Sequence, residues 1–177
     1  MRVVSGKYKG RKLKEFNLNT TKPTLDKVKE AIFDMIQFDV VDSVVLDLFS
    51  GTGALGIEAI SRGAKKTYLI DNNIQAIKII KENLKGVTED YSVINQNGLE
   101  FLKSNNEKFD IVLLDPPYQT DLGLKAIEIL INENKLNNNA IIVFETSNDL
   151  NIELNYPSFK IIKKKYGTVA VFKMVKQ

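Results

Sequence analysis

A glycine-rich turn with the spacing G-x-G-x-x-G, formed by Gly51, Gly53 and Gly56, limits the possible folds of this chain more than any other feature. The apolar run Val44–Leu48 precedes the turn and a helical pattern follows it, so the glycines stand where a strand passes into a helix. Asp71 ends the next apolar run. This arrangement is typical of nucleoside-containing cofactor sites, because glycines let a ligand approach the backbone and the carboxylate can hold ribose hydroxyls.

Apolar strands alternate with helical segments along the chain. Further strands are predicted at Thr67–Ile70, Tyr91–Ile94, Phe109–Leu114 and Ala140–Phe144, helices after Pro23 and over Ile74–Leu84, and a final hairpin around Tyr166-Gly167. This alternation predicts the α/β class, with a Rossmann-like, doubly wound and mostly parallel sheet. We expect residues 1–177 to form a single domain that begins with a basic arm over residues 1–20, folded as a short β-hairpin, although the glycines around its basic turn also suit a flexible arm.

The chain contains neither cysteine nor histidine. Thiolate chemistry, a His-based triad and a His-ligated metal are therefore excluded, and we expect no metal. No apolar run approaches the roughly 18 residues of a membrane span. The first residues also lack the apolar core of a secretory signal. We accordingly expect a cytoplasmic protein without a membrane partner, and a monomer.

Asp47 discriminates between the cofactors that such a turn can hold. It ends the first strand, where a dinucleotide would place its pyrophosphate. A carboxylate repels a pyrophosphate but attracts the cationic methionine end of S-adenosylmethionine, so we expect that cofactor rather than NAD. Asp47 could instead be a solvated or helix-capping carboxylate. The residues expected to bind the cofactor are Asp47, Phe49, Ser50, Gly51, Thr52, Gly53, Leu55, Asp71, Asn72, Asn97 and Gly98.

The tetrapeptide Asp115-Pro116-Pro117-Tyr118 follows the predicted strand Phe109–Leu114. Two prolines make a rigid turn, but a turn alone needs neither the carboxylate nor the aromatic ring. An exocyclic amine needs both. Asp115 and the carbonyl of Pro116 can accept its hydrogen bonds and Asp115 can receive its proton, while Tyr118 can stack on a base taken out of its helix. We therefore expect all four residues to act in methyl transfer to an exocyclic amine.

Positive charge gathers near both ends of the chain, although the net charge is only +3. In the arm, the residues expected to contact RNA phosphates are Arg2, Lys7, Lys9, Arg11 and Lys12. A second cluster in the final hairpin consists of Lys160, Lys163, Lys164 and Lys165. Either cluster could instead be solvated surface, which is the commoner role of such runs.

These motifs resemble those of amino-methyltransferases with the class I S-adenosylmethionine-dependent fold. Over nearly the whole chain, the sequence is similar to the RsmD family, bacterial enzymes that methylate guanine N2 in 16S ribosomal RNA. The similarity is carried by residues 2–13, residues 21–31 and, most specifically, residues 46–63. The resemblance implies a seven-stranded sheet with one antiparallel strand, S-adenosylmethionine over the glycine turn, and ribosomal RNA or the small-subunit particle as partner.

A few positions depart from the family pattern. Lys22, Lys27 and Lys29 stand where arginine is typical, which removes bidentate phosphate contacts. Asn97 stands where an aspartate commonly meets the adenine amino group. Its side-chain oxygen can accept the same hydrogen bond, but without charge, so the resemblance implies a lower cofactor affinity.

Four other functions share part of the pattern. An adenine-N6 methyltransferase of DNA or RNA would share the tetrapeptide, but a DNA enzyme usually carries a separate sequence-reading domain, for which 177 residues leave no room. A protein glutamine methyltransferase would have no use for the basic arm. A non-catalytic RNA-binding module would not need Asp47, Asp71 and Asp115 intact. An NAD-dependent oxidoreductase is disfavoured by Asp47.

Overall fold

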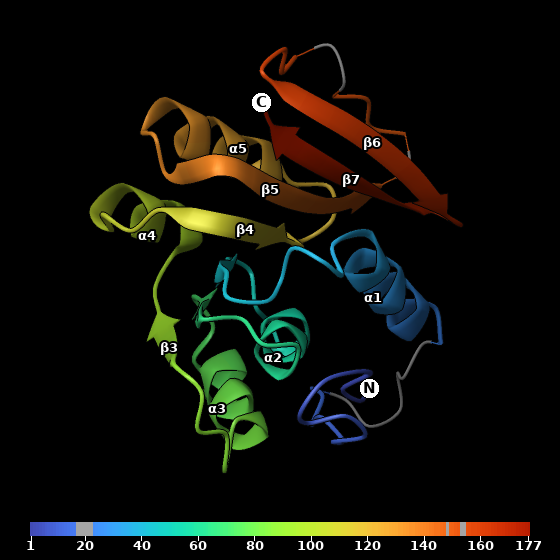
Figure 1. Cartoon of the computed structure of the whole chain (residues 1–177), viewed down its shortest axis with the longest axis vertical. Coiled ribbons are helices and arrows are strands. Elements are labelled where there is room, and N and C mark those ends of the chain that lie inside the picture. Colours follow the sequence, from blue (N-terminus) through green and yellow to red (C-terminus); the bar gives the residue numbers. More distant parts are fainter. Residues whose placement is uncertain (17–22, 148, 153–154) are drawn as a thin grey trace.

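The computed structural model describes residues 1–16, 23–147, 149–152 and 155–177. Its strands form one sheet in the order β3-β2-β1-β4-β5-β7-β6 (Figure 1). The strands are β1 Val44–Asp47, β2 Lys66–Asp71, β3 Tyr91–Asn95, β4 Phe109–Leu114, β5 Leu136–Ser147, β6 Phe159–Tyr166 and β7 Val169–Lys176. The helices are α1 Pro23–Met35, α2 Ala54–Ser61, α3 Ile74–Asn83, α4 Gly98–Ser104 and α5 Leu122–Asn132. The described helices include none with the length and apolarity that crossing a membrane requires.

The sheet is mostly parallel, as predicted. Strands β1 to β5 run parallel to their neighbours, β7 runs antiparallel to β5, and β6 runs antiparallel to β7. Within the described strands, β7 is thus the one that opposes the others, which confirms the seven-stranded arrangement implied by the family. The chain leaves β1 toward β2 and β3 and returns to β4 on the other side of β1. Ligands bind beyond the carboxyl ends of the strands at such a switch point.

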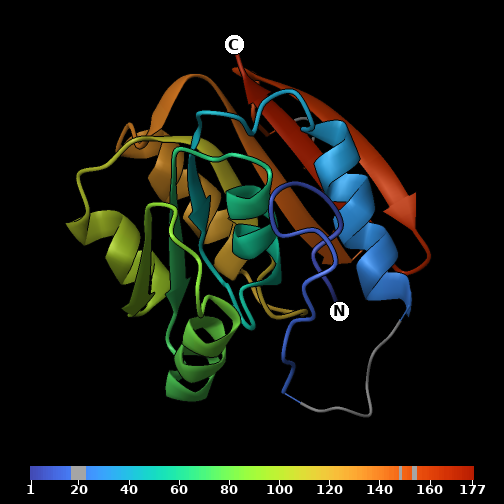
Figure 2. The same ribbon diagram turned by 60° about the horizontal axis from the view of Figure 1, so that its bottom comes forward.

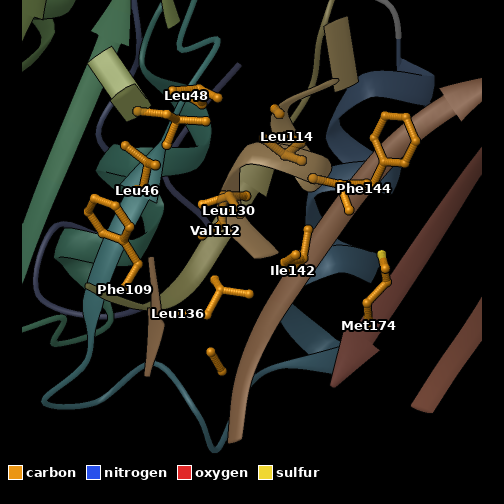
Figure 3. Close-up of a cluster of buried hydrophobic side chains, with 14 of the residues drawn as sticks. Leu46, Leu48, Phe109, Val112, Leu114, Leu130, Leu136, Ile142, Phe144 and Met174 are labelled. Atoms are coloured by element: carbon orange, nitrogen blue, oxygen red, sulfur yellow. The ribbon is translucent and has the colours of Figure 1, made fainter. Parts of the chain in front are cut away.

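Both faces of the central strands of the sheet are buried, and for this reason their sequences are continuous apolar runs rather than alternating ones. On one face, β4 packs Val112 and Leu114 against α4 and α5, in the cluster drawn in Figure 3. On the other face, Ile111 and Leu113 pack in a cluster with residues of α1. Because both faces of β4 are buried, its carboxyl end is held rigidly, and Asp115 follows directly.

The described part of the N-terminal arm, residues 1–16, is a compact loop rather than a pair of strands. Its antiparallel pairing consists of one bridge, between Arg2 and Lys12. Val3 and Leu13 are buried in a cluster with residues of α2 and α3, and Figure 2 shows the arm curled against α2. Within residues 1–16 the expected β-hairpin is therefore reduced to a single bridge, because this part of the arm packs onto helices instead of forming a ladder. Residues 17–20 of the expected arm lie outside the described residues.

Glu58 of α2 anchors this arm. It is fully buried and accepts hydrogen bonds from the backbone N–H groups of Val4 (2.9 Å) and Ser5 (3.0 Å). Its carboxylate also pairs with Nζ of Lys29 (3.3 Å) and Nε of Arg62 (2.8 Å). A buried carboxylate needs such partners to offset its lost hydration. Lys29 is therefore a structural cation and is not available to an RNA phosphate.

Candidate active site

The carboxyl ends of β1, β2 and β4 border a cavity of about 620 Å³, which is within the range of small-molecule sites, roughly 300–1,000 Å³. The predicted residues that line it are Asp47, Phe49, Ser50, Gly51, Thr52, Leu55, Asp71, Asn72, Asn97, Gly98, Asp115, Pro116, Pro117 and Tyr118. The arm adds three residues that sequence reasoning did not foresee, namely Met1, Glu15 and Phe16. The cavity thus joins the predicted cofactor site to the predicted catalytic tetrapeptide.

Two glycines of the turn serve different purposes. Gly51 has φ +56°, and a Cβ added there would have no heavy atom within 4 Å, so Gly51 leaves the room that a ligand needs. Gly53 has φ +82° and faces the core. A Cβ at Gly53 would lie 3.1 Å from Ile57, 3.2 Å from Ile80 and 3.3 Å from Leu69. Gly53 is not among the residues that line the cavity, and its surroundings show that it is needed for its backbone conformation and for core packing.

Asp47 is buried at the end of β1, with 1% of its surface exposed. Its Oδ2 accepts a hydrogen bond from the N–H of Gly56 (2.9 Å), and a Cβ at Gly56 would lie 3.0 Å from that oxygen. Its Oδ1 is buried and has no hydrogen-bond partner among the described residues. Burial, with a smaller contribution from the charge of Asp71, raises the pKa of Asp47 to about 7, against the lowering effect of the Gly56 N–H. A cation in the cavity would supply the partner that Oδ1 lacks.

Asp71 holds the glycine turn in place. Its Oδ2 accepts a hydrogen bond from the N–H of Gly51 (2.8 Å), and its Oδ1 accepts one from the N–H of Asn73 (2.8 Å). Each carboxylate oxygen has more than one acceptor site, so Asp71 can still receive hydroxyl groups. Its orientation is thereby set before a ligand arrives.

Asn97 is the N-cap of α4. Its side-chain oxygen accepts hydrogen bonds from the N–H groups of Leu99 (3.0 Å) and Glu100 (3.2 Å). A hydrogen bond from an adenine amino group to this oxygen, as expected from the sequence, would compete with the cap. The amide nitrogen of Asn97 is the atom that remains for a ligand.

Asp115 stands among carboxylates from neighbouring strands. Burial raises its pKa well above the ordinary value for aspartate, and the charges of Glu145 and Asp47 raise it further. Both effects disfavour a negative charge on Asp115. The same effects make its carboxylate a stronger base than an exposed one, which suits a group that must accept a proton.

Tyr118 and Glu145 form a pair that the sequence analysis missed. The Tyr118 hydroxyl donates a hydrogen bond to Oε1 of Glu145 (3.0 Å). Glu145, on β5, is 5% exposed, whereas Tyr118 is 52% exposed. Burial raises the pKa of Glu145, and burial together with the Glu145 charge raises that of Tyr118. The signal that could have revealed Glu145 is its position directly after the apolar run Ala140–Phe144, comparable with Asp115 after β4.

The basic residues of the arm divide into two groups. Lys7 pairs with Glu89 at 2.5 Å, and Arg11 donates to the backbone carbonyls of Asn83 (3.1 Å) and Lys85 (2.8 Å). Three basic residues of the arm are exposed and have no side-chain partner among the described residues, namely Arg2, Lys9 and Lys12.

Of the positions that depart from the family pattern, Lys27 is exposed and Lys22 lies outside the described residues. The described part of the chain contains no cluster of three or more His, Cys, Asp or Glu residues that could hold a metal.

A family model described as "Conserved hypothetical protein 95" matches residues 1–175. The ribosomal RNA small subunit methyltransferase D of Haemophilus influenzae is 40% identical over 154 residues, which cover 84% of this chain and 80% of that protein. The protein of the same name from Buchnera aphidicola (subsp. Baizongia pistaciae) is 38% identical over 170 residues, which cover 95% and 87%. The solved structure described as putative methyltransferase yhhF from Escherichia coli matches with a TM-score of 0.88 at 30% identity, covering 100% of this chain and 98% of the other.

Proposed function

From the premise that this chain belongs to the RsmD family of ribosomal RNA methyltransferases, we propose that it transfers a methyl group from S-adenosylmethionine to the exocyclic N2 of a guanine in 16S ribosomal RNA. The observation that carries the proposal is the meeting of two sites in one cavity. Asp47 brings a buried acceptor without a partner, and Asp115-Pro116-Pro117-Tyr118 brings the groups that suit an amine on a planar base.

The residues of the cavity fit this cofactor. Asp47 would pair with its ammonium group through the unpaired Oδ1, and Asp71 would receive its ribose hydroxyls beside the open backbone of Gly51. The cofactor supplies an electrophilic methyl group on a positively charged sulfur. A pyrophosphate would instead meet the charges of Asp47 and Asp71 at this edge, which disfavours a dinucleotide.

Asp115 orients the amine and takes its proton. The lone pair of a guanine amine is delocalised into the ring, and acceptors at Asp115 and the Pro116 carbonyl turn the N–H groups so that the lone pair points away from the ring plane. As the nitrogen gains a substituent it becomes acidic, and the carboxylate of Asp115 is a stronger base because burial, Glu145 and Asp47 raise its pKa. Asp115 therefore works as a general base in its ionised form.

Tyr118 provides the platform for the base. Its half-exposed ring offers a face on which a guanine taken out of the RNA can stack, and Glu145 holds its hydroxyl in a fixed position. The buried carboxylate thus limits the movement of the ring on the far side from solvent.

The remaining parts of the proposal concern partners and location. We propose that the substrate is ribosomal RNA or the small-subunit particle, that the protein works as a cytoplasmic monomer, and that residues 1–177 act as a single domain. The arm would contact RNA phosphates through its exposed cations, Arg2, Lys9 and Lys12, while Lys7 and Arg11 are held by partners within the chain.

The proposal is tested by incubating the protein with methyl-labelled S-adenosylmethionine and small-subunit particles from a strain that lacks the enzyme. Nucleosides released from the RNA are then identified by mass. We expect labelled N2-methylguanosine with the wild type, little product with Asp115→Ala, and wild-type yield with Asp121→Ala, which changes an exposed carboxylate paired with Lys125. Labelled N6-methyladenosine would replace the guanine assignment, and absence of label in any nucleoside would overturn the proposal.

A further inference from the structure

The end of the β6–β7 hairpin carries two lysines that the proposed function does not use. Lys164 and Lys165 are exposed at the carboxyl end of β6, and neither has a side-chain partner among the described residues. Tyr166 and Gly167 follow them, and Gly167 begins the turn into β7 with φ +62°. Since β6 runs in the same direction as β1 to β5, this end of β6 lies on the side of the sheet where the parallel strands have their carboxyl ends (Figure 1), and residues at the carboxyl ends of β1, β2 and β4 line the cavity.

The register of the sheet places these lysines two strands away from Glu145. Glu145 of β5 is paired with Val171 of β7, which is paired with Lys164 of β6. Neighbouring strands are about 4.8 Å apart, so the backbone at Lys164 lies roughly 10 Å from that at Glu145. Lys165 occupies the next row, which has the sequence Thr146, Ala170, Lys165 across the three strands. Val171 and Ala170 belong to core clusters on opposite faces of the sheet. Lys164 therefore lies on the same face as Glu145, whose side chain holds Tyr118, and Lys165 lies on the opposite face, one row nearer the hairpin turn.

Two nearby lysines, Lys163 and Lys173, have partners within the protein. Lys163, the residue before Lys164, donates a hydrogen bond to the carbonyl of Leu150 and lies over the ring of Phe172. Lys173 on β7 pairs with Asp39. The positive charge of Lys164 and Lys165 is by contrast not neutralised by a described residue. A polyanion is the ligand that such a pair of flexible cations suits.

Exposed lysines on an edge strand also have a simpler role, because they discourage pairing with the edge of another chain. Lys160 serves that role equally well, since it is exposed on the same strand and on the same face as Lys164. Lys160 lies four residues before Lys164 in β6, which places it about 13 Å farther from the carboxyl end of the strand. Protection of the edge makes Lys160 and Lys164 equivalent, whereas a role in substrate binding does not.

We propose that Lys164 and Lys165 form a phosphate-binding surface for the RNA strand next to the target guanine. This inference rests on the proposed function. Lys164 lies two strands from Glu145, the partner of Tyr118, and Lys165 lies on the other side of the same hairpin end, so the RNA backbone on one side of the extracted base would pass over the hairpin end. Binding of the RNA would then involve both the N-terminal arm and the final hairpin.

The test compares Lys164→Ala/Lys165→Ala with a control of equal charge change, Lys160→Ala/Lys103→Ala. Lys103 is exposed in the last turn of α4, away from the cavity residue Gly98 that begins this helix. Binding to a 16S ribosomal RNA transcript is measured between about 50 and 200 mM salt, because each phosphate contact contributes about 0.7–0.9 to the slope of log affinity against log salt. We expect a slope smaller by about 1.5 and roughly tenfold weaker binding near 100 mM salt in the hairpin variant, and wild-type values in the control.

Two further measurements separate the possible outcomes. Lys164→Arg/Lys165→Arg should restore RNA binding, and calorimetric affinity for S-adenosylmethionine should be the same in every variant. Equal loss in the hairpin and control variants would show a general effect of net charge and overturn the inference, as would wild-type binding by the hairpin variant. A wild-type protein that binds the transcript through the hairpin but forms no N2-methylguanosine on small-subunit particles would instead contradict the proposed function.

Discussion

Replacing Asp47 with asparagine should stabilise the protein while it weakens cofactor binding. Burial moves the pKa of Asp47 from 3.8 to about 7, and each pKa unit corresponds to about 1.4 kcal/mol. Because the folded state binds the proton more tightly than the unfolded state, stability falls as the pH rises from about 4 to about 7. Above that range the ionised carboxylate costs about 4 kcal/mol of unfolding free energy.

The Asp47→Asn variant would keep the useful contact and lose the charge. The side-chain oxygen of the asparagine can accept the N–H of Gly56 as Asp47 does at 2.9 Å. Removing the Asp47 charge also lowers the pKa of Asp115, which acts in the same direction. We therefore expect Asp47→Asn to be more stable than the wild type by up to about 4 kcal/mol at pH 8, and the advantage to shrink by about 2.5 kcal/mol at pH 5.

The assay is urea unfolding at several pH values, together with calorimetric titration of S-adenosylmethionine. Affinity for the cofactor should fall by about 1.5–3 kcal/mol, the contribution of a hydrogen bond to a charged group. Asp121→Asn, at an exposed position, should change neither quantity. An Asp47→Asn protein that is less stable than the wild type at pH 8 would refute this reasoning, and so would the same pH dependence of the unfolding free energy in the two proteins. Either result would show that the Asp47 carboxylate is not a destabilising buried charge in the absence of a cation.

Asp115→Ala should reduce turnover by about 10²–10³ with cofactor affinity nearly intact, because one preorganised partner of the transition state is lost; rapid-quench methylation and calorimetry measure the two quantities. Glu145→Gln keeps a hydrogen-bond acceptor for Tyr118 but lowers the pKa of Asp115, so the acidic limb of the kcat–pH profile should move to lower pH, and an unmoved limb would separate Glu145 from the base. Tyr118→Phe leaves the buried Glu145 without its hydroxyl partner and should cost about 1–3 kcal/mol of unfolding free energy above neutral pH, seen by urea unfolding, while the stacking face remains. Gly53→Val should destabilise the fold by several kcal/mol, because it strains a positive φ and crowds core side chains, whereas Gly51→Val should cost only the backbone strain and should also block the cofactor; equal loss of stability in both would contradict the different surroundings of the two glycines.

Local sequence patterns determined much of the fold and most of the candidate site. The apolar runs, the glycine turn and the prolines predict where strands end, and parallel strands share one edge at their carboxyl ends. Asp47, Asp71 and Asp115 could therefore be placed together without any knowledge of distant contacts, and all three line one cavity. The three carboxylates could be predicted at the carboxyl ends of the strands because each of them directly follows or ends an apolar run.

Only the tertiary structure decided which residues from distant segments meet. The hydrogen bond from Tyr118 to Glu145 spans 27 residues, and the contacts of Glu58 with the arm span more than 50. Neither pairing has a local signal, because the position of β5 beside β4 and of the arm on α2 results from packing of the whole core. The position of Lys164 in the same row of the sheet as Glu145 has the same cause. Strand β7 lies antiparallel between β5 and β6, and the register of these pairings depends on long-range burial of one face of each strand.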